Sequence, residues 1–143
     1  MNQMADLVLR PAEAHDVAAV LAFWRTAAED RNRPVDTPGA LATLHLRDPD
    51  ALILAVDGDA IVGSIVAGWD GWRCHLYRLA VAPDRRRQGI ARALITAAEE
   101  RFRVLGASRV DAMVLDDNPA AHRIWAACGY RRQQEWSRWV KPL

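Results

Sequence analysis

Apolar residues recur along this chain at two spacings, and each spacing predicts a different kind of element. Residues three and four positions apart form one stripe of an amphipathic helix, whereas short apolar runs closed by turn residues are typical of strands. Helices are predicted over residues 14–28, 38–46 and 89–105, and over a short segment that ends at Gly129. Strands are predicted over residues 6–10, 52–56, 61–69, 73–81 and 109–115, with one or two more within 130–140.

Turn and cap residues mark the ends of several of these elements. Asp57-Gly58-Asp59 and Asp70-Gly71 each separate two apolar runs. An Asp-Gly pair in that position is a strong signal for a β-hairpin. Thr37 followed by Pro38 predicts a helix start, and Gly106 predicts a left-handed cap at a helix end.

The order of the elements predicts the fold class. If the helix at 89–105 is a crossover, the strand at 109–115 lies beside the strand at 73–81. The order β-α-α-β-β-β-α-β-α-β then predicts an α/β fold, with a mixed, mostly antiparallel central sheet and helices on both faces. The length of 143 residues suits a single domain over residues 1–143, and no repeat or low-complexity segment divides it.

Composition and charge narrow the class of protein. The formal net charge of +1 gives no global case for binding nucleic acid or an anionic membrane. Lys141 is the only lysine, so nearly all the positive charge is arginine, whose fork of donors suits phosphate. No apolar run is long enough for a transmembrane helix, and the first residues lack the regions of a signal peptide. We therefore expect a cytoplasmic protein without a membrane partner.

The two cysteines, Cys74 and Cys128, do not have the spacing of metal ligands. No metal site is expected, and a disulfide is not expected in a reducing compartment. We interpret both as small, buried or half-buried apolar side chains.

The stretch from Leu76 to Leu94, LYRLAVAPDRRRQGIARAL, joins a strand to a helix through a basic loop. Pro83 ends the strand because proline cannot donate to a strand ladder. The first N–H groups of the helix lack partners, and together with the helix dipole and the arginines they favour an anion such as a diphosphate. A Cβ at Gly89 would hold a phosphate away from the backbone. On the loop alone, an ordinary connection with solvated arginines explains the pattern equally well.

The motifs around this loop resemble those of one family. The common phosphate loops G-x-x-x-x-G-K-[ST] and G-x-G-x-x-G are absent. The segment Arg86-Arg87-Gln88-Gly89-Ile90-Ala91 resembles the [QR]-x-x-G-x-[GA] signature of the GNAT superfamily of N-acetyltransferases, and Leu79-Ala80-Val81-Ala82-Pro83 resembles the strand end that precedes it. Downstream, Asn118 and the segment from Ala121 to Tyr130 match a further motif of the family at every fixed position but one, where Trp125 replaces a tyrosine.

The resemblance covers nearly the whole chain and implies an enzyme that uses acetyl-coenzyme A as co-substrate. It implies that the backbone of Leu79 and Val81 pairs with the pantetheine arm, and that an N–H near Val81 polarises the acetyl carbonyl. Asn118 would bond the pantetheine, and Arg123 would approach a phosphate. The implied cofactor-binding residues are Leu79, Ala80, Val81, Arg86, Arg87, Gln88, Gly89, Ile90, Ala91, Asn118 and Arg123.

His75, Tyr77 and Trp125 are the candidate catalytic residues. His75 lies four residues before Leu79, where some members of the family carry a catalytic glutamate, and strand alternation predicts that His75, Tyr77 and Leu79 share one face. An imidazole accepts a proton near neutral pH. A surface histidine, with the amine deprotonated through water, is the alternative.

Trp125 stands where the family usually has a tyrosine that protonates the leaving thiolate. An indole N–H is a donor but not an acid, so it can solvate the sulfur without protonating it. Tyr77 or Tyr130 would then supply the proton, or water would. The alternative, which we favour, is that Trp125 is a packing aromatic.

The resemblance places acceptor recognition on the first two helices and on the hairpin at Asp70. An acidic Asp70 near aromatic side chains would suit a cationic amine, whereas Trp24 also fits a core position by its helical spacing. The candidate acceptor-binding residues are Trp24, Arg31, Arg33, Trp69, Asp70 and Trp72.

The leading hypothesis is direct acetyl transfer to a primary amine of a small molecule or of a peptide N-terminus. The substitution at Trp125 keeps a second hypothesis open, a non-catalytic module that binds or senses acyl-coenzyme A. A nucleic-acid binder is disfavoured by the near-neutral charge. A homodimer is left open.

Overall fold

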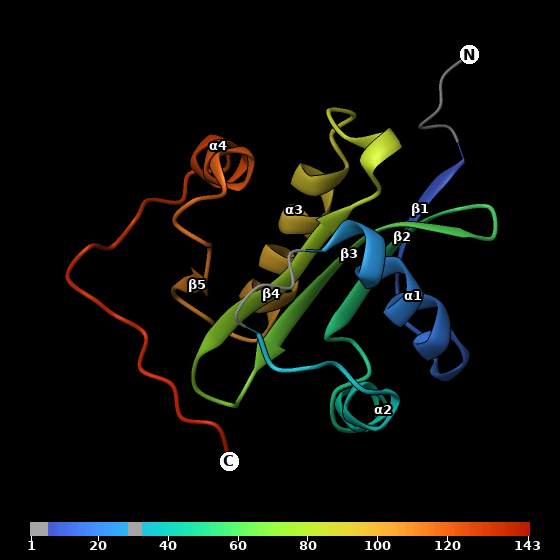
Figure 1. The fold of residues 1–143 in the computed structure, drawn as a ribbon, viewed down its shortest axis with the longest axis horizontal. Helices are drawn as coiled ribbons and strands as arrows, with labels where there is room; N and C mark the ends of the chain where they lie inside the picture. Colours follow the sequence, from blue (N-terminus) through green and yellow to red (C-terminus); the bar gives the residue numbers. More distant parts are fainter. Residues whose placement is uncertain (1–5, 29–32) are drawn as a thin grey trace. The chain divides into compact units, whose positions relative to one another are not determined.

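The computed structural model describes residues 6–28 and 33–143 and divides into two units, Met1–Met113 and Val114–Leu143 (Figure 1). In the first unit the described strands are β1 (Leu7–Pro11), β2 (Leu52–Asp57), β3 (Ala60–Trp69), β4 (Cys74–Val81) and β5 (Val110–Ala112). Its helices are α1 (Val17–Ala27), α2 (Pro38–Arg47) and α3 (Ile90–Val104), with 3₁₀ turns at Ala14–Asp16 and Pro83–Arg85. The second unit contains α4 (Pro119–Ala127).

The strands of the first unit form a sheet in the order β1-β2-β3-β4-β5. The first four are antiparallel neighbours: tight turns join β2 to β3 and β3 to β4, whereas α1 and α2 lie between β1 and β2 in the chain. β5 pairs in parallel with β4, because α3 carries the chain back across the sheet between them. The predicted mixed, mostly antiparallel sheet is confirmed, and so are both predicted hairpins.

Helices cover the two faces of this sheet, as predicted (Figure 1). On one face α1 and α2 bury Val20, Trp24 and Leu41 in a cluster that includes Leu54 and Val66 of the sheet. α3 covers the other face. There a Cβ added to Gly63 of β3 would lie 2.9 Å from both Ile90 and Leu94 of α3, so glycine allows this helix to approach the sheet closely.

Two predicted helix ends are also confirmed. The Oγ1 of Thr37 accepts a hydrogen bond from the N–H of Ala40 at 3.1 Å and caps α2, with Pro38 in the first turn. Gly106 follows α3 with a φ of 88°, the left-handed conformation that was predicted for it.

β4 contains a bulge that the sequence pattern does not reveal. Tyr77 pairs with Val66 and Ala80 pairs with Ser64, so two residues of β4 face a single residue of β3. Arg78, the first of the two, has a φ of 53°, which a non-glycine residue seldom adopts. A bulge of this kind bends the strand and changes which face the following side chains occupy.

The bulge overturns one prediction about the candidate catalytic residues. Strand alternation predicts that His75, Tyr77 and Leu79 share a face. His75 and Tyr77 do lie on the face that α1 and α2 cover, but the extra residue places Leu79 on the face of α3. The prediction is wrong for Leu79 because strict alternation holds only in a regular strand.

Two further strand predictions need correction. The strand predicted over 109–115 is shorter, Val110–Ala112. The closing strands predicted within 130–140 are wrong, because residues 114–143, all of which the structure describes, contain no strand. A strand needs a neighbour that pairs with its backbone groups. Residues 131–143 are instead exposed throughout, including Trp136 and Trp139.

No helix within the described ranges has the length and apolar character needed to cross a membrane.

Candidate active site

The edge of β4 that faces β5 is paired over only part of its length. β5 pairs with Cys74, His75 and Leu76, and in the described part of the chain no strand continues this ladder along residues 77–81. The N–H and C=O groups of a strand edge along which no further strand runs are able to pair with an extended ligand. The sheet therefore offers such a ligand a backbone edge at 77–81, which includes the predicted cofactor-binding residues Leu79, Ala80 and Val81.

The edge leads directly to the basic loop and to the N-terminus of α3. Gly89 is the residue that precedes the helix, with a φ of 85° and no side chain to cap the first turn. A Cβ built on Gly89 would meet no atom within 4 Å, so the space beside this helix start is open. Uncapped N–H groups and the helix dipole together make such a start suited to an anion.

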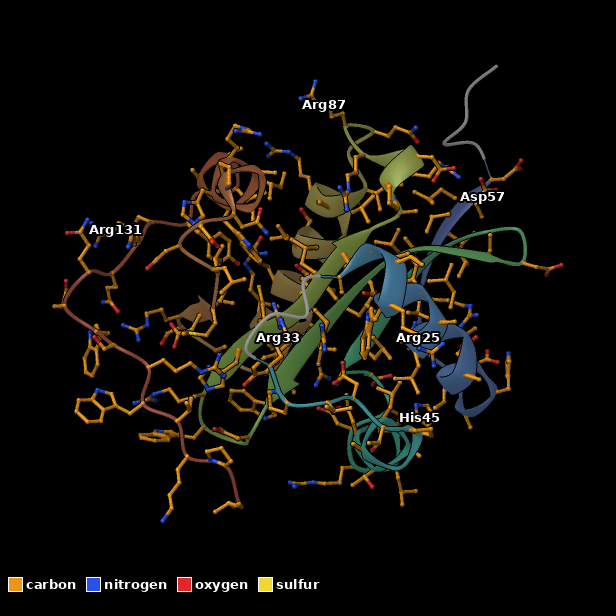
Figure 2. The ribbon with its side chains drawn as sticks, viewed as in Figure 1. Arg25, Arg33, His45, Asp57, Arg87 and Arg131 are labelled. Atoms are coloured by element: carbon orange, nitrogen blue, oxygen red, sulfur yellow. The ribbon has the colours of Figure 1, made fainter. Side chains whose placement is uncertain are left out.

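The three arginines of the loop have different roles. Arg85 is held inside the protein: its Nη1 lies 2.7 Å from Oδ2 of Asp57, and its Nε donates to Oε1 of Gln88 at 3.0 Å. Arg86 donates from Nε to the carbonyl of Val81 at 3.3 Å. Arg87 extends outward from the loop (Figure 2).

Asp57 is therefore a residue of the site that the sequence reasoning missed. It lies at the end of β2, where it was interpreted only as part of a hairpin turn. Its ion pair with Arg85 connects the first hairpin to the loop, 28 positions along the chain. No local pattern in the sequence could indicate such a contact, although the location of Asp57 beside a predicted turn was correct.

His75 lies beside two groups that bear on proton transfer. Its Nδ1 is 3.8 Å from Oδ2 of Asp111, its partner on β5, and its ring centroid is 6.2 Å from that of Tyr77. The His75 side chain is 38% exposed, so it remains accessible to solvent. Asp111 was not a predicted site residue, because the pairing register of two strands joined by a long helix cannot be read from their sequences.

A cavity of about 260 Å³ lies on the face of the sheet covered by α1. Its apolar wall includes Leu21, Trp24 and Val35. Trp24 is buried and donates from Nε1 to Oγ of Ser64 at 2.8 Å, and Ser64 in turn donates to the carbonyl of Arg78 at 2.8 Å. Trp24 thus belongs to the core and also forms part of the cavity wall. Arg33, another predicted acceptor residue, lines the same cavity.

The hairpin at Asp70 does not line this cavity. Oδ1 of Asp70 accepts hydrogen bonds from the N–H groups of Trp72 and Arg73, at 2.7 and 2.6 Å. These bonds lower the pKa of Asp70 and fix its carboxylate in the turn. The guanidinium of Arg73 lies 3.6 Å from the centre of the exposed Trp72 ring. The cation that contacts this ring is therefore a side chain of the protein and not the amine of an acceptor. Trp69, the third predicted acceptor residue here, ends β3 before this turn.

Another predicted acceptor residue, Arg31, lies outside the described residues.

The second unit contains the remaining predicted site residues. Asn118 caps α4, with its Oδ1 accepting from the N–H of Ala121 at 3.2 Å, and Arg123 is exposed on the same helix. Trp125 is buried and meets the ring of Tyr130 edge-on, with ring centroids 4.8 Å apart. This contact supports the packing interpretation of Trp125.

The sequence and the fold are both similar to those of known proteins. The sequence model of the acetyltransferase (GNAT) family matches residues 17–130. An acetyltransferase of Pectobacterium atrosepticum is 38% identical over 106 residues, which cover 73% of this chain and 74% of that protein. The crystal structure of Ard1 from Thermoplasma volcanium has a TM-score of 0.75 at 22% identity, and the match covers 87% of this chain and 82% of that one. Diaminobutyrate acetyltransferase from Paenibacillus lautus, solved with L-2,4-diaminobutyric acid and coenzyme A, has a TM-score of 0.72 at 26% identity, over 85% of this chain and 73% of that one.

Proposed function

Because the chain belongs to the acetyltransferase (GNAT) family, we propose that it transfers an acetyl group from acetyl-coenzyme A directly to a primary amine. The amine is that of a small molecule or of a peptide N-terminus. The observation that carries this proposal is that β5 extends along β4 only to Leu76, so that residues 77–81 of β4 lie beyond the end of β5 and lead into the loop and the open helix start at Gly89. One continuous surface then serves the pantetheine arm and the diphosphate of the co-substrate.

The residues of this surface fit the co-substrate in chemical type. Acetyl-coenzyme A supplies an extended arm with amide groups, a diphosphate and a reactive thioester. The backbone of Leu79 and Val81 pairs with the arm, and the N–H groups from Gln88 to Ala91 receive the diphosphate. Arg86 and Arg87 add positive charge beside it. Arg85 is proposed to hold the loop in place and not to bind the diphosphate, because its guanidinium contacts Asp57 and Gln88.

His75 is the proposed proton acceptor of the reaction. An amine must lose a proton to attack a thioester, and an imidazole accepts one near neutral pH. Asp111 stabilises the imidazolium that forms, through a separation of 3.8 Å. Tyr77 borders His75 on the same face and is the nearby hydroxyl group that returns a proton to the thiolate.

The proposed roles of Asn118, Arg123 and Trp125 rest on the family resemblance. Asn118 would bond the pantetheine and Arg123 a phosphate. Trp125 has a packing role in this proposal, because its ring contacts Tyr130 and its indole N–H is not an acid. Residues 1–143 then make up one acetyltransferase domain of a cytoplasmic enzyme.

Turnover is the test of this function. The purified chain is incubated with acetyl-coenzyme A and a panel of primary amines and peptides, and free thiol is measured. We expect thiol release that depends on one class of amine and produces an equimolar acetylated product by mass spectrometry. If acetyl-coenzyme A binds but no amine is acetylated, the chain is a binding or sensing module and the catalytic proposal is wrong.

A further inference from the structure

We propose that the cavity beside α1 binds an anionic group of the acceptor, so that the substrate is a small amine that also carries a carboxylate or phosphate. This inference rests on the proposed acetyl transfer and names the class of its acceptor. It adds an anionic group to the expectation drawn from Asp70, which was that the acceptor is a cationic amine.

The charge of the cavity is the first observation. Its charged lining, within the described part of the chain, consists of three arginines and one aspartate, namely Arg25, Arg33, Arg78 and Asp36. These four described residues together have a formal charge of +2. Figure 2 shows Arg25 on α1 and Arg33 on the segment that precedes α2, and both belong to the face of the sheet that these helices cover. Such a cavity attracts anions and opposes amines that carry only positive charge.

The surroundings of Arg78 show how a carboxylate fits this wall. The Arg78 side chain is only 8% exposed, its guanidinium lies 5.1 Å from the centre of the Trp24 ring, and it pairs with the carboxylate of Asp36. Asp36 neutralises Arg78, because a buried cation needs a counter-charge. Each guanidinium carries five N–H donors, so one partner does not exhaust what an arginine can bind. Arg25 and Arg33 are the other two cations among the described lining residues, and the proposal assigns the anionic group of the acceptor to them.

The position of the cavity relates it to the reaction. Arg78 lies at the bulge of β4, directly before Leu79 on the strand edge that is proposed to pair with the co-substrate. An acceptor held by its anionic end against Arg25 and Arg33 has its other end free to reach this strand. The volume of about 260 Å³ limits the acceptor to a small molecule or to one terminal residue of a chain.

The proposal is tested with matched pairs of amines in which the anionic member carries a carboxylate or phosphate and its neutral partner lacks that group. The probes are β-alanine and β-alaninamide, 4-aminobutyrate and 4-aminobutanamide, and phosphoethanolamine and ethanolamine. Acetylation is followed by thiol release, and direct binding of each probe by calorimetry. We expect the anionic member of at least one pair to have a kcat/KM about tenfold or more above that of its neutral partner.

Variants assign this preference to the cavity. Arg25→Gln and Arg33→Gln are each expected to raise the KM of the preferred anionic probe about tenfold, with little change for its neutral partner or in the affinity for acetyl-coenzyme A. Arg47→Gln is the matched control, because Arg47 is an exposed arginine of α2 that does not line the cavity. Circular dichroism verifies that each variant is folded.

The outcomes separate the two proposals. Turnover that is equal within every pair, or unaffected by both cavity variants, overturns the anionic acceptor and leaves acetyl transfer intact. Binding of an anionic probe that depends on Arg25 and Arg33, without turnover of any amine, supports the anion site and overturns the catalytic function. Neither binding nor turnover overturns both.

Discussion

Arg85 and Asp57 form an ion pair, with Nη1 2.7 Å from Oδ2, that joins the basic loop to the end of β2. The Arg85 side chain is 14% exposed and that of Asp57 is 32% exposed, so the pair is partly shielded from water. Arg85 also holds Gln88, which lies directly before Gly89. The pair therefore determines the conformation of the loop in which the diphosphate is proposed to bind.

Asp57→Asn is expected to weaken acetyl-coenzyme A binding about three- to tenfold and to lower the free energy of unfolding by about 1 to 2 kcal/mol. The reason is that Arg85 loses its counter-charge and no longer fixes Gln88. Calorimetry and urea unfolding measure the two effects. Asp59→Asn, at an exposed position of the same hairpin, is the control and should change neither. Equal affinities of the wild type and Asp57→Asn would show that the ion pair does not order the loop.

His75→Ala is expected to lower kcat/KM and to change its dependence on pH, because the proposed proton acceptor of the reaction is then missing. The measurement is kcat/KM of the wild type and the variant at a series of pH values from acidic to alkaline. His15→Ala is the control, since His15 also lies near a carboxylate, 3.2 Å from Oε2 of Glu13, but belongs to the turn before α1. A profile unchanged by His75→Ala would remove this residue from the mechanism.

Trp125→Tyr tests whether the aromatic of α4 has a packing or a chemical role. The packing role predicts a loss of about 1 to 2 kcal/mol in the free energy of unfolding with kcat unchanged, because a smaller ring leaves the edge contact with Tyr130 incomplete. Urea unfolding and steady-state kinetics of the folded variant provide the two values. An increase in kcat would instead mean that the new hydroxyl group protonates the thiolate.

Asp16 predicts a stability that depends on pH. Two hydrogen bonds from Arg10, at 2.7 and 3.1 Å, lower the pKa of the Asp16 carboxyl, although its burial acts in the opposite direction. The folded state thus binds the Asp16 proton less readily than the unfolded state, and this contribution to stability is complete above the ordinary aspartate pKa. It is lost as the pH falls through the lowered value.

Asp16→Asn should therefore reduce the free energy of unfolding by about 2 kcal/mol at pH 7, with a smaller difference from wild type below about pH 4. Urea unfolding at a series of pH values measures this difference. Asp84→Asn, an exposed aspartate of the 3₁₀ turn before the loop, provides the baseline. A difference between Asp16→Asn and wild type that stays constant with pH would contradict the assignment.

Local signals in the sequence predicted most of the fold. The Asp-Gly pairs, the Thr37-Pro38 cap and Gly106 act on their immediate neighbours, so their effects could be anticipated without knowledge of the rest of the chain. The helix start at Gly89 was predicted for the same reason. The predicted strands within 130–140 failed because a strand also depends on a partner, which an apolar spacing alone does not supply.

The parts of the site that could not be predicted depend on contacts between distant residues. The ion pair of Arg85 with Asp57 and the approach of His75 to Asp111 require the pairing register of the sheet. The bulge at Arg78 depends on the pairing of β3 with β4, and no glycine or other turn residue marks its position in the sequence. The guanidinium of Arg78 also lies over the ring of Trp24. Trp24, which was predicted as a core residue, therefore shares a cavity wall with Arg78.

The most direct test of the central claim is calorimetric titration of the protein with acetyl-coenzyme A and with acetylpantetheine, which lacks the diphosphate. Gly89→Glu is compared with Gly106→Glu, because both glycines flank α3, have φ values of 85° and 88°, and have no atom near a built Cβ. Micromolar binding of acetyl-coenzyme A, about 100-fold weaker binding of acetylpantetheine, and loss of binding in Gly89→Glu alone are the results that we predict. Equal binding of the two compounds, or unchanged affinity in Gly89→Glu, would contradict the diphosphate site at the start of α3.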